Sequence, residues 1–207
     1  MKKIALQNNS PTSLLENSLL NKGYKYIIGI DEAGRGAWAG PLAMAAFIYT
    51  KELDQIANIK DSKLLSPSKR EQILKNLRLE NSYLELIPAQ LIDKVGLAKV
   101  IEIAITNLIS RINLANAIYL IDGNYKLNVP AEYRSIINGD KNHIVISSAS
   151  IVAKVKRDRL MLKYDEIFPE YGFKSHKGYG TKQHLNALNK YGICPIHRKS
   201  FKPIINI

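Results

Sequence analysis

The sequence predicts one α/β domain built on a mixed β-sheet. Three short apolar runs early in the chain are typical of buried strands, and helical and strand-like segments then alternate along the rest of the chain. A chain of 207 residues is long enough to bury a sizeable core within a single domain.

The first half of the chain opens with a polar, loosely helical lead-in over residues 1–23. Ser66 suits a helix N-cap and Pro67 suits the first helical position, so we expect a helix from there to about Leu77. Apolar residues recur at helical spacing over 96–112, which is the clearest helix of the sequence. The expected strands of this half cover residues 26–30, 42–49 and 82–87.

The second half continues the alternation. A loop rich in Gly, Tyr and Lys is expected over 169–180. Thr181 suits the N-cap of the last helix and Gly192 suits its end. The expected strands are 117–121 and 144–147, and the expected helices are 148–168 and 181–191.

The chain is strongly basic, with 30 Lys and Arg against 18 Asp and Glu, a net charge of +12 and a pI near 9.6. A folded protein of this kind usually meets a polyanion, such as nucleic acid, an anionic membrane or an acidic protein. Candidates for contacts with phosphate are Lys60, Lys63, Lys69, Arg70, Lys174, Lys177, Lys182, Arg198 and Lys199.

Other features indicate a cytoplasmic protein without membrane contact. No apolar run approaches the length of a membrane span, and the single Cys194 cannot form an internal disulfide. The first residues begin like a signal peptide, but the polar stretch at 7–10 interrupts them before an apolar core can form.

Two adjacent carboxylates, Asp31 and Glu32, follow the first strand and precede Gly34-Arg35-Gly36. Acids at the end of a buried strand are costly without a partner, and a hard divalent cation is a natural one. The glycines allow close backbone approach to a ligand, with a guanidinium in reach. The pattern suits chemistry on a phosphate backbone, and it also suits a solvated acidic turn. Because neighbours on a strand point to opposite faces, both acids serve one site only where the strand ends.

Two further acids stand out. Asp122 also ends an apolar run before a glycine, and it either converges with Asp31 at the carboxyl edge of the sheet or makes a simple Asp-Gly turn. On a helical wheel of 148–168, Asp158 falls inside the apolar stripe that contains Ile151. A charge there needs a partner, which is either Arg159 in a structural ion pair or a metal site.

Nine short motifs follow one another along the chain, each occurring once. In order, they are Gly29-Ile30-Asp31-Glu32-Ala33-Gly34-Arg35-Gly36, Ala39-Gly40-Pro41, Asp61-Ser62-Lys63, Ile121-Asp122-Gly123, Gly139-Asp140, Ala149-Ser150-Ile151-Val152-Ala153-Lys154-Val155, Arg157-Asp158-Arg159, His176-Lys177-Gly178-Tyr179-Gly180-Thr181 and His197-Arg198. Each is weak alone. In this order, from about Tyr26 to Lys202, they resemble bacterial ribonuclease HII.

The resemblance implies a ribonuclease-H-like α/β domain over residues 24–207, with a mixed central sheet flanked by helices and a small helical C-terminal part from about 165. It implies an endoribonuclease that cleaves the RNA strand of RNA–DNA hybrids and nicks duplex DNA 5′ of embedded ribonucleotides. The expected reaction is two-metal-ion hydrolysis with Mn²⁺ or Mg²⁺, leaving 3′-OH and 5′-phosphate. We expect a monomer that removes ribonucleotides and RNA primers from DNA.

The resemblance also implies roles for individual residues. The catalytic and metal-binding acids would be Asp31, Glu32, Asp122 and Asp158. The turn Gly34-Arg35-Gly36 would contact the 2′-hydroxyl at the RNA–DNA junction. Tyr179 would pack on the deoxyribose that follows, and Lys63 would lie on a phosphate near the cut.

Other classes stay open beside this one. The sister family, ribonuclease HIII, has an extra N-terminal substrate-binding domain and lacks the Gly-Arg-Gly turn, whereas only about 25 residues precede the first strand here. The chain departs from the family pattern at Leu64, where a second lysine is frequent, and at Ala37, where proline is frequent. A related metal nuclease or recombinase could share the four acids. A non-catalytic nucleic-acid-binding module would explain the charge but not the placement of the acids.

Overall fold

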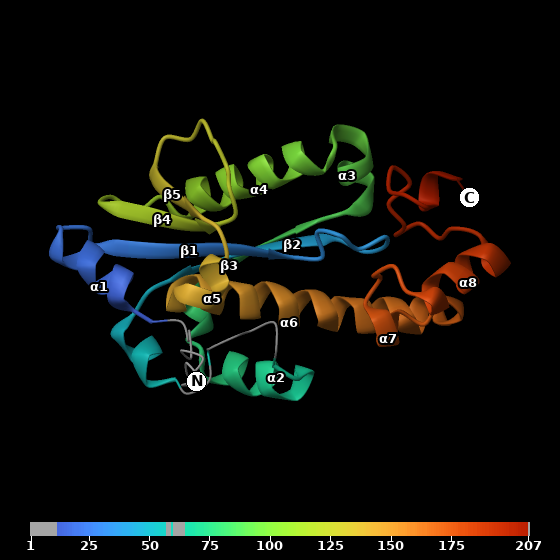
Figure 1. Ribbon diagram of the computed structural model, residues 1–207, viewed down its shortest axis with the longest axis horizontal. Helices are drawn as coiled ribbons and strands as arrows, with labels where there is room; N and C mark the ends of the chain where they lie inside the picture. The colour runs from blue at the N-terminus through green and yellow to red at the C-terminus, as the bar shows by residue number, and fades with distance from the viewer. Residues whose placement is uncertain (1–11, 57–58, 60–64, 207) are drawn as a thin grey trace, which may run out of the picture.

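The computed structural model describes residues 12–56, 59 and 65–206. In this part of the chain, five strands form one sheet in the order β3-β2-β1-β4-β5 (Figure 1). The central strand β1 pairs antiparallel with β2 and parallel with β4, so the sheet is mixed as predicted. The strands are β1 Tyr26–Ala33, β2 Leu42–Ile48, β3 Ser82–Ile87, β4 Ala117–Asp122 and β5 Glu132–Ile136.

Helices cover both faces of this sheet, with α3 and α4 on one side and α2, α5 and α6 on the other (Figure 1). The α-helices are α1 Leu14–Asn21, α2 Pro67–Asn76, α3 Ala89–Val95, α4 Leu97–Ile112, α5 Gly139–Asn142, α6 Ile144–Ile167, α7 Phe173–His176 and α8 Lys182–Tyr191. Short 3-10 turns are η1 Lys51–Gln55, η2 Leu79–Asn81, η3 Pro169–Tyr171 and η4 Ile204–Asn206.

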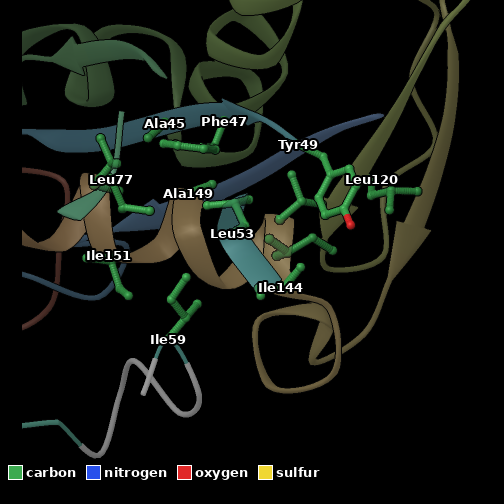
Figure 2. Packing of buried hydrophobic residues seen from close by; sticks show 14 of the residues in the cluster. Ala45, Phe47, Tyr49, Leu53, Ile59, Leu77, Leu120, Ile144, Ala149 and Ile151 are labelled. Atoms are coloured by element: carbon green, nitrogen blue, oxygen red, sulfur yellow. The ribbon is translucent and has the colours of Figure 1, made fainter. Parts of the chain in front are cut away.

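Two apolar clusters fill the two interfaces between helices and sheet. Side chains of β1 alternate between them, since Ile28 belongs to the cluster under α4 and Ile27 to the cluster under α6. Figure 2 shows the α6 side, where Phe47 of β2 and Leu120 of β4 lie with Ala149 of α6. The long helix α6 is therefore fixed against the strands that carry the predicted acids.

Gly29 sets the distance between β1 and α6. A Cβ added at Gly29 would lie 2.4 Å from the backbone carbonyl of Val145. Only glycine permits an approach this close. The first turns of α6 consequently rest directly on the middle of β1.

The described part of the lead-in packs on the domain. Leu19 of α1 is fully buried in the cluster under α6. Glu16 is also fully buried, and its Oε1 accepts a hydrogen bond from the Val145 N–H at 3.2 Å, so it caps the start of α6. Burial raises the pKa of Glu16 to about 7. The boundary expected between lead-in and domain stays a prediction.

The loop expected over 169–180 contains the short helices η3 and α7, and two expectations about strands also fail. The strand expected at 144–147 is wrong, because these residues form the first turn of α6. They are buried on all sides, and periodicity cannot separate a fully buried helical turn from a strand. The edge strand β5 at Glu132–Ile136 was missed, because its half-exposed, polar sequence lacks an apolar run.

The C-terminal part packs around a third apolar cluster that includes Phe173, Leu188 and Met161 of α6. Thr181 caps α8 by accepting a hydrogen bond from the His184 N–H, and α8 ends at Gly192, so both helix signals are confirmed. In the described ranges, every helix is too short or too polar to cross a membrane.

Candidate active site

Asp31 and Asp122 occupy adjacent positions at the ends of two parallel strands. The pairing of β1 with β4 sets Ile30 opposite Ile121, and each of these residues directly precedes an acid. Side chains alternate along a strand, so Asp31 lies on the same face of β1 as Ile27, and Asp122 lies on the same face of β4 as Leu120. Both carboxylates are therefore on the face covered by α6. Asp31 is only 2% exposed. The parallel register is thus what brings these two acids together.

Backbone N–H groups orient both carboxylates. The Glu32 N–H donates to Asp31 Oδ1 at 2.7 Å, and the Gly139 N–H donates to Asp122 Oδ1 at 2.7 Å. Charge-assisted bonds of this kind are short and strong. The acids are therefore held in place by the backbone.

Glu32 belongs to the same group, although it alternates with Asp31 along β1. The hydroxyl of Tyr125 reports this convergence, because burial and then the charges of Glu32, Asp122 and Asp31 raise the pKa of Tyr125 to about 12, against the opposing charge of Arg35. Arg35 Nη1 lies 3.5 Å from Glu32 Oε1 and donates to the Tyr125 hydroxyl at 3.2 Å. The charges of three acids from two strand ends therefore act on one tyrosine.

Asp140 is an acid that sequence reasoning noticed within a motif but gave no role. It lies in the first turn of α5, is 1% exposed, and follows Gly139, the residue whose N–H holds Asp122. The available signal was the Gly139-Asp140 motif itself, but without β5 and α5 nothing brought it near the other acids. We call Asp31, Glu32, Asp122 and Asp140 the acid edge.

Asp158 lies elsewhere, on α6. Its Oδ1 accepts a hydrogen bond from Lys154 Nζ at 2.8 Å. Asp158 lies two turns, about 12 Å along the helix axis, after Ser150, which lines the pocket described below. The predicted ion pair between Asp158 and Arg159 is wrong, because Arg159 Nε donates instead to Glu71 Oε1 of α2 at 2.9 Å. The Asp158 side chain is only 16% exposed, so it is sheltered as the helical wheel predicted, whereas Leu162 further along α6 is 40% exposed.

The turn Gly34-Arg35-Gly36 follows β1 directly and is closed by a hydrogen bond from the Ala37 N–H to the Gly34 carbonyl at 3.2 Å. Gly34 has a φ of +87°, and an added Cβ would lie 2.0 Å from Arg157 Nε. Gly36 is exposed, with nothing near the position of a Cβ. Gly36 therefore presents bare backbone to solvent, whereas Gly34 is buried against Arg157.

Tyr179 is held between two glycines that pack on the residues after this turn. A Cβ at Gly178 would lie 2.4 Å from the Ala39 carbonyl oxygen, and one at Gly180 would lie 2.1 Å from the Trp38 ring. Lys154 Nζ lies 5.5 Å from the centroid of the Tyr179 ring. We call Gly34-Arg35-Gly36 and Tyr179 together the reading surface.

A chain of neutral histidines holds the backbone of Tyr179. The Cys194 N–H donates to His197 Nδ1 at 2.9 Å, which leaves the proton of His197 on Nε2, facing His184 Nε2 at 3.0 Å. The proton of His184 then sits on Nδ1, 3.0 Å from the Tyr179 carbonyl oxygen. Burial lowers the pKa of both histidines to about 4.

One pocket of about 340 Å³ joins the acid edge to the reading surface. Its lining residues are Glu32, Ala33, Gly34, Arg35, Gly36, Arg70, Ser150, Lys154 and Tyr179. A larger groove of about 820 Å³ lies beside Tyr24 and Glu132, at the opposite ends of the strands. Of these two, only the smaller pocket is lined by a residue of the acid edge, Glu32.

Lys63 and Arg198 are two of the residues expected to contact phosphate. Lys63, with the rest of Asp61-Ser62-Lys63, lies outside the described residues. Arg198, one of the candidate basic residues, is fully buried and binds backbone carbonyls, so it is not a surface contact. Lys154, which lines the pocket, was not among the candidates.

Known structures share this fold. The chain superposes on ribonuclease HII of Archaeoglobus fulgidus, solved in complex with PCNA, with a TM-score of 0.74 at 22% identity over 86% of this chain and 95% of that one. Bst-RNase HIII, solved with Mn²⁺, gives 0.74 at 18% identity over 94% of this chain and 72% of that one. The fold is therefore the ribonuclease-H-like fold.

Sequence comparison narrows the class to one family. The family model for ribonuclease HII matches residues 28–204. Ribonuclease HII of Acholeplasma laidlawii is 43% identical over 93% of this chain and 95% of its own length, and that of Bacillus licheniformis is 45% identical over 91% and 74%. The chain belongs to the ribonuclease HII family and is an endoribonuclease that acts on RNA–DNA hybrids.

Proposed function

We propose that this chain hydrolyses the RNA strand with the help of divalent cations at the acid edge, and that it also nicks duplex DNA on the 5′ side of a single ribonucleotide. The products would be a 3′-OH and a 5′-phosphate. The observation that carries the proposal is the pocket in which Glu32 shares a wall with the Gly34-Arg35-Gly36 turn and Tyr179. A catalytic carboxylate then stands beside groups suited to a ribose.

The acid edge fits hard cations such as Mg²⁺ or Mn²⁺, because its donors are carboxylate oxygens from two strand ends and one helix start. In the described part of the chain, no group of three or more His, Cys, Asp or Glu is arranged so that it could hold a metal ion. Mg²⁺ commonly takes only one or two protein carboxylates and completes its shell with water and substrate phosphates, so the substrate would have to supply part of the coordination here. Bound cations would stabilise the attacking water and the leaving 3′ oxygen.

We propose Asp140 as the fourth acid, in place of Asp158. Support comes from its burial and from the direct link between its neighbour Gly139 and Asp122. Asp158 is instead engaged with Lys154, whose ammonium lies near the ring of Tyr179. Its role would be to set the position of that lysine.

Selection of RNA would rest on the reading surface. A protein tells RNA from DNA by the 2′-hydroxyl, which both donates and accepts hydrogen bonds. Within the Gly34-Arg35-Gly36 turn, Gly36 offers exposed backbone with no side chain in the way. The ring of Tyr179 offers a flat apolar face for the neighbouring deoxyribose.

We further infer a monomer working in the cytoplasm. Every group of the proposed site comes from one chain, so no second copy is needed to complete it. The single Cys194 cannot form an internal disulfide, which suits a reducing compartment. The biological role would be removal of ribonucleotides and RNA primers from DNA.

Three labelled duplexes test the proposal: all-DNA, DNA with one ribonucleotide, and a long RNA–DNA hybrid. With Mg²⁺ or Mn²⁺ the second should be nicked 5′ of the ribonucleotide and the third cut at many positions, and chelator should stop both. The all-DNA duplex should bind with similar, salt-sensitive affinity and stay intact. Cleavage of the long hybrid without nicking at the single ribonucleotide would contradict the proposal.

A further inference from the structure

Two arginines are fully buried between the loop after β1 and the C-terminal part of the chain. Arg157 lies on α6 and Arg198 lies near the C-terminus, and both are 0% exposed. Burial lowers the pKa of both groups, and the charge of Arg157 further lowers that of Arg198, to about 9. Two buried cations that repel each other are costly, so their hydrogen bonds must offset that cost.

Arg157 connects the loop after β1 with the residues just before Tyr179. Its Nε donates to the Pro41 carbonyl at 2.9 Å and its Nη2 donates to the Ala39 carbonyl at 3.0 Å. On the other side, Nη1 donates to the Lys177 carbonyl at 2.9 Å. One planar guanidinium thereby joins Pro41 and Lys177, which are 136 residues apart in sequence.

Arg198 ties the same loop to the chain terminus. Its Nε donates to the Gly40 carbonyl at 3.1 Å, and its Nη1 donates to the Arg35 carbonyl at 2.9 Å. The Arg198 N–H also donates to the Trp38 carbonyl at 2.8 Å. The carbonyl of the middle residue of the Gly-Arg-Gly turn is thus fixed by a buried side chain.

The guanidinium of Arg157 also touches both halves of the reading surface. Its Cζ lies 5.3 Å from the centroid of the Tyr179 ring, within reach of a cation–π contact. On the side of the turn, Gly34 lies so close that an added Cβ would be 2.0 Å from Arg157 Nε. The Arg157 guanidinium therefore lies against both the Gly34-Arg35-Gly36 turn and the Tyr179 ring.

We propose that Arg157 and Arg198 are positioning residues for substrate selection, whose buried guanidinium groups hold the Gly34-Arg35-Gly36 turn and Tyr179 at a fixed spacing. The inference rests on the proposed function of the reading surface. A duplex with one ribonucleotide has a single productive register, so it depends on that spacing. A long hybrid offers many registers and tolerates a looser surface.

The test uses Arg157→Lys and Arg198→Lys, which keep the charge but cannot bond several carbonyls in one plane. Single-turnover rates are measured on the single-ribonucleotide duplex and on the long hybrid. We expect the ratio of the two rates to fall by about tenfold or more, which is the loss typical of a buried charged hydrogen bond. Arg159→Lys is the matched control, because Arg159 is the exposed partner of Glu71, and its ratio should stay at the wild-type value.

A second measurement needs no substrate. Trp38 is the only tryptophan of the sequence, its backbone N–H donates to the Gly178 carbonyl at 2.8 Å, and its ring centroid lies 5.4 Å from that of His184. Its fluorescence therefore reports on the contact between the two tied segments. Acrylamide quenching should rise in Arg157→Lys and stay unchanged in Arg159→Lys. This result stands even if the wild-type protein fails to nick at a single ribonucleotide, so the two failures are distinguishable.

Three results would overturn the proposal. One is an unchanged rate ratio together with unchanged quenching in a folded lysine variant. Another is an equal loss on both substrates, which would assign the arginines to the acid edge. The third is a failure of both lysine variants to fold at the assay temperature, shown by circular dichroism, which would give the arginines a purely stabilising role.

Discussion

The acid edge and the reading surface are assembled in opposite ways. At the acid edge, the backbone places the side chains: β1 and β4 carry Asp31 and Asp122 in register, and N–H groups orient both carboxylates. At the reading surface, side chains place the backbone, because Arg157 and Arg198 gather carbonyls from distant segments. Changes at the acid edge should therefore affect chemistry with little effect on shape, whereas changes around the reading surface should affect geometry first.

The largest effect is expected from Asp31→Asn and Asp122→Asn. Removing a metal-binding carboxylate should lower the single-turnover rate on a long hybrid by about a thousandfold or more. The melting temperature should hold or rise, because one repelling charge leaves a crowded acidic group.

Glu80→Gln is the matched control, since Glu80 is an exposed acid away from this edge. Its rate should equal that of the wild type. Substantial turnover by Asp31→Asn in saturating Mg²⁺ would show that the chemistry lies elsewhere.

An intermediate effect is expected from Tyr179→Ala. Loss of the ring face should slow nicking at a single ribonucleotide by about tenfold, with a smaller loss on the long hybrid. Tyr179→Phe keeps the ring and should retain the wild-type ratio of the two rates. Equal losses on both substrates in Tyr179→Ala would remove the tyrosine from substrate selection.

The acid edge was largely predictable from the sequence. A buried strand followed by Asp31 and Glu32, and another ending at Asp122, carry a local signal that needs no knowledge of distant contacts. The exception is Asp140, whose position depends on β5 and α5. Those two elements are short and lack strong periodicity, so sequence reasoning passed over them.

The support of the reading surface was not predictable in this way. Arg157 and Arg198 are charged residues within motifs, and base rates favour solvated positions for such residues. Their burial follows from carbonyl groups of segments 35–41 and 177, which come together only in the folded chain. The partner expected for Asp158 was wrong for a different reason: Lys154 lies one helical turn before it, a spacing that the predicted helix already allowed, but Arg159 was considered instead.

A smaller effect concerns pH and the histidines behind Tyr179. The pKa of His184 and of His197 is lowered to about 4, so the folded protein favours their neutral forms. Their contribution to stability is full above about pH 6.5 and is lost as pH falls toward 4, at about 1.4 kcal/mol per pH unit for each histidine. Thermal unfolding between pH 7 and 5 should show this loss, and His184→Gln should show a shallower slope. An identical slope in the variant would exclude the histidine as its source.

The smallest expected effect comes from Glu16 at the start of α6. Its contribution to stability changes with pH in the direction opposite to that of the histidines. The pKa of Glu16 is raised to about 7 by burial, so its contribution to stability is full below about pH 4.5 and is lost as pH rises toward 7. Glu16→Gln keeps a neutral acceptor for the Val145 N–H and should be free of this dependence. Its melting temperature relative to wild type should therefore be higher at pH 7.5 than at pH 5. No change in that difference would contradict the assignment.

The separation of the two regions is tested most directly by comparing Asp140→Asn with Asp158→Asn. Single-turnover cleavage of a long hybrid in saturating Mg²⁺ is measured for both, with melting temperatures to confirm folding. The account predicts a loss of several orders of magnitude for Asp140→Asn, because it removes a carboxylate of the acid edge. It predicts a loss within about tenfold for Asp158→Asn, because that change only weakens the bond to Lys154. The reverse order, with Asp158→Asn inactive and Asp140→Asn near the wild-type rate, would contradict it.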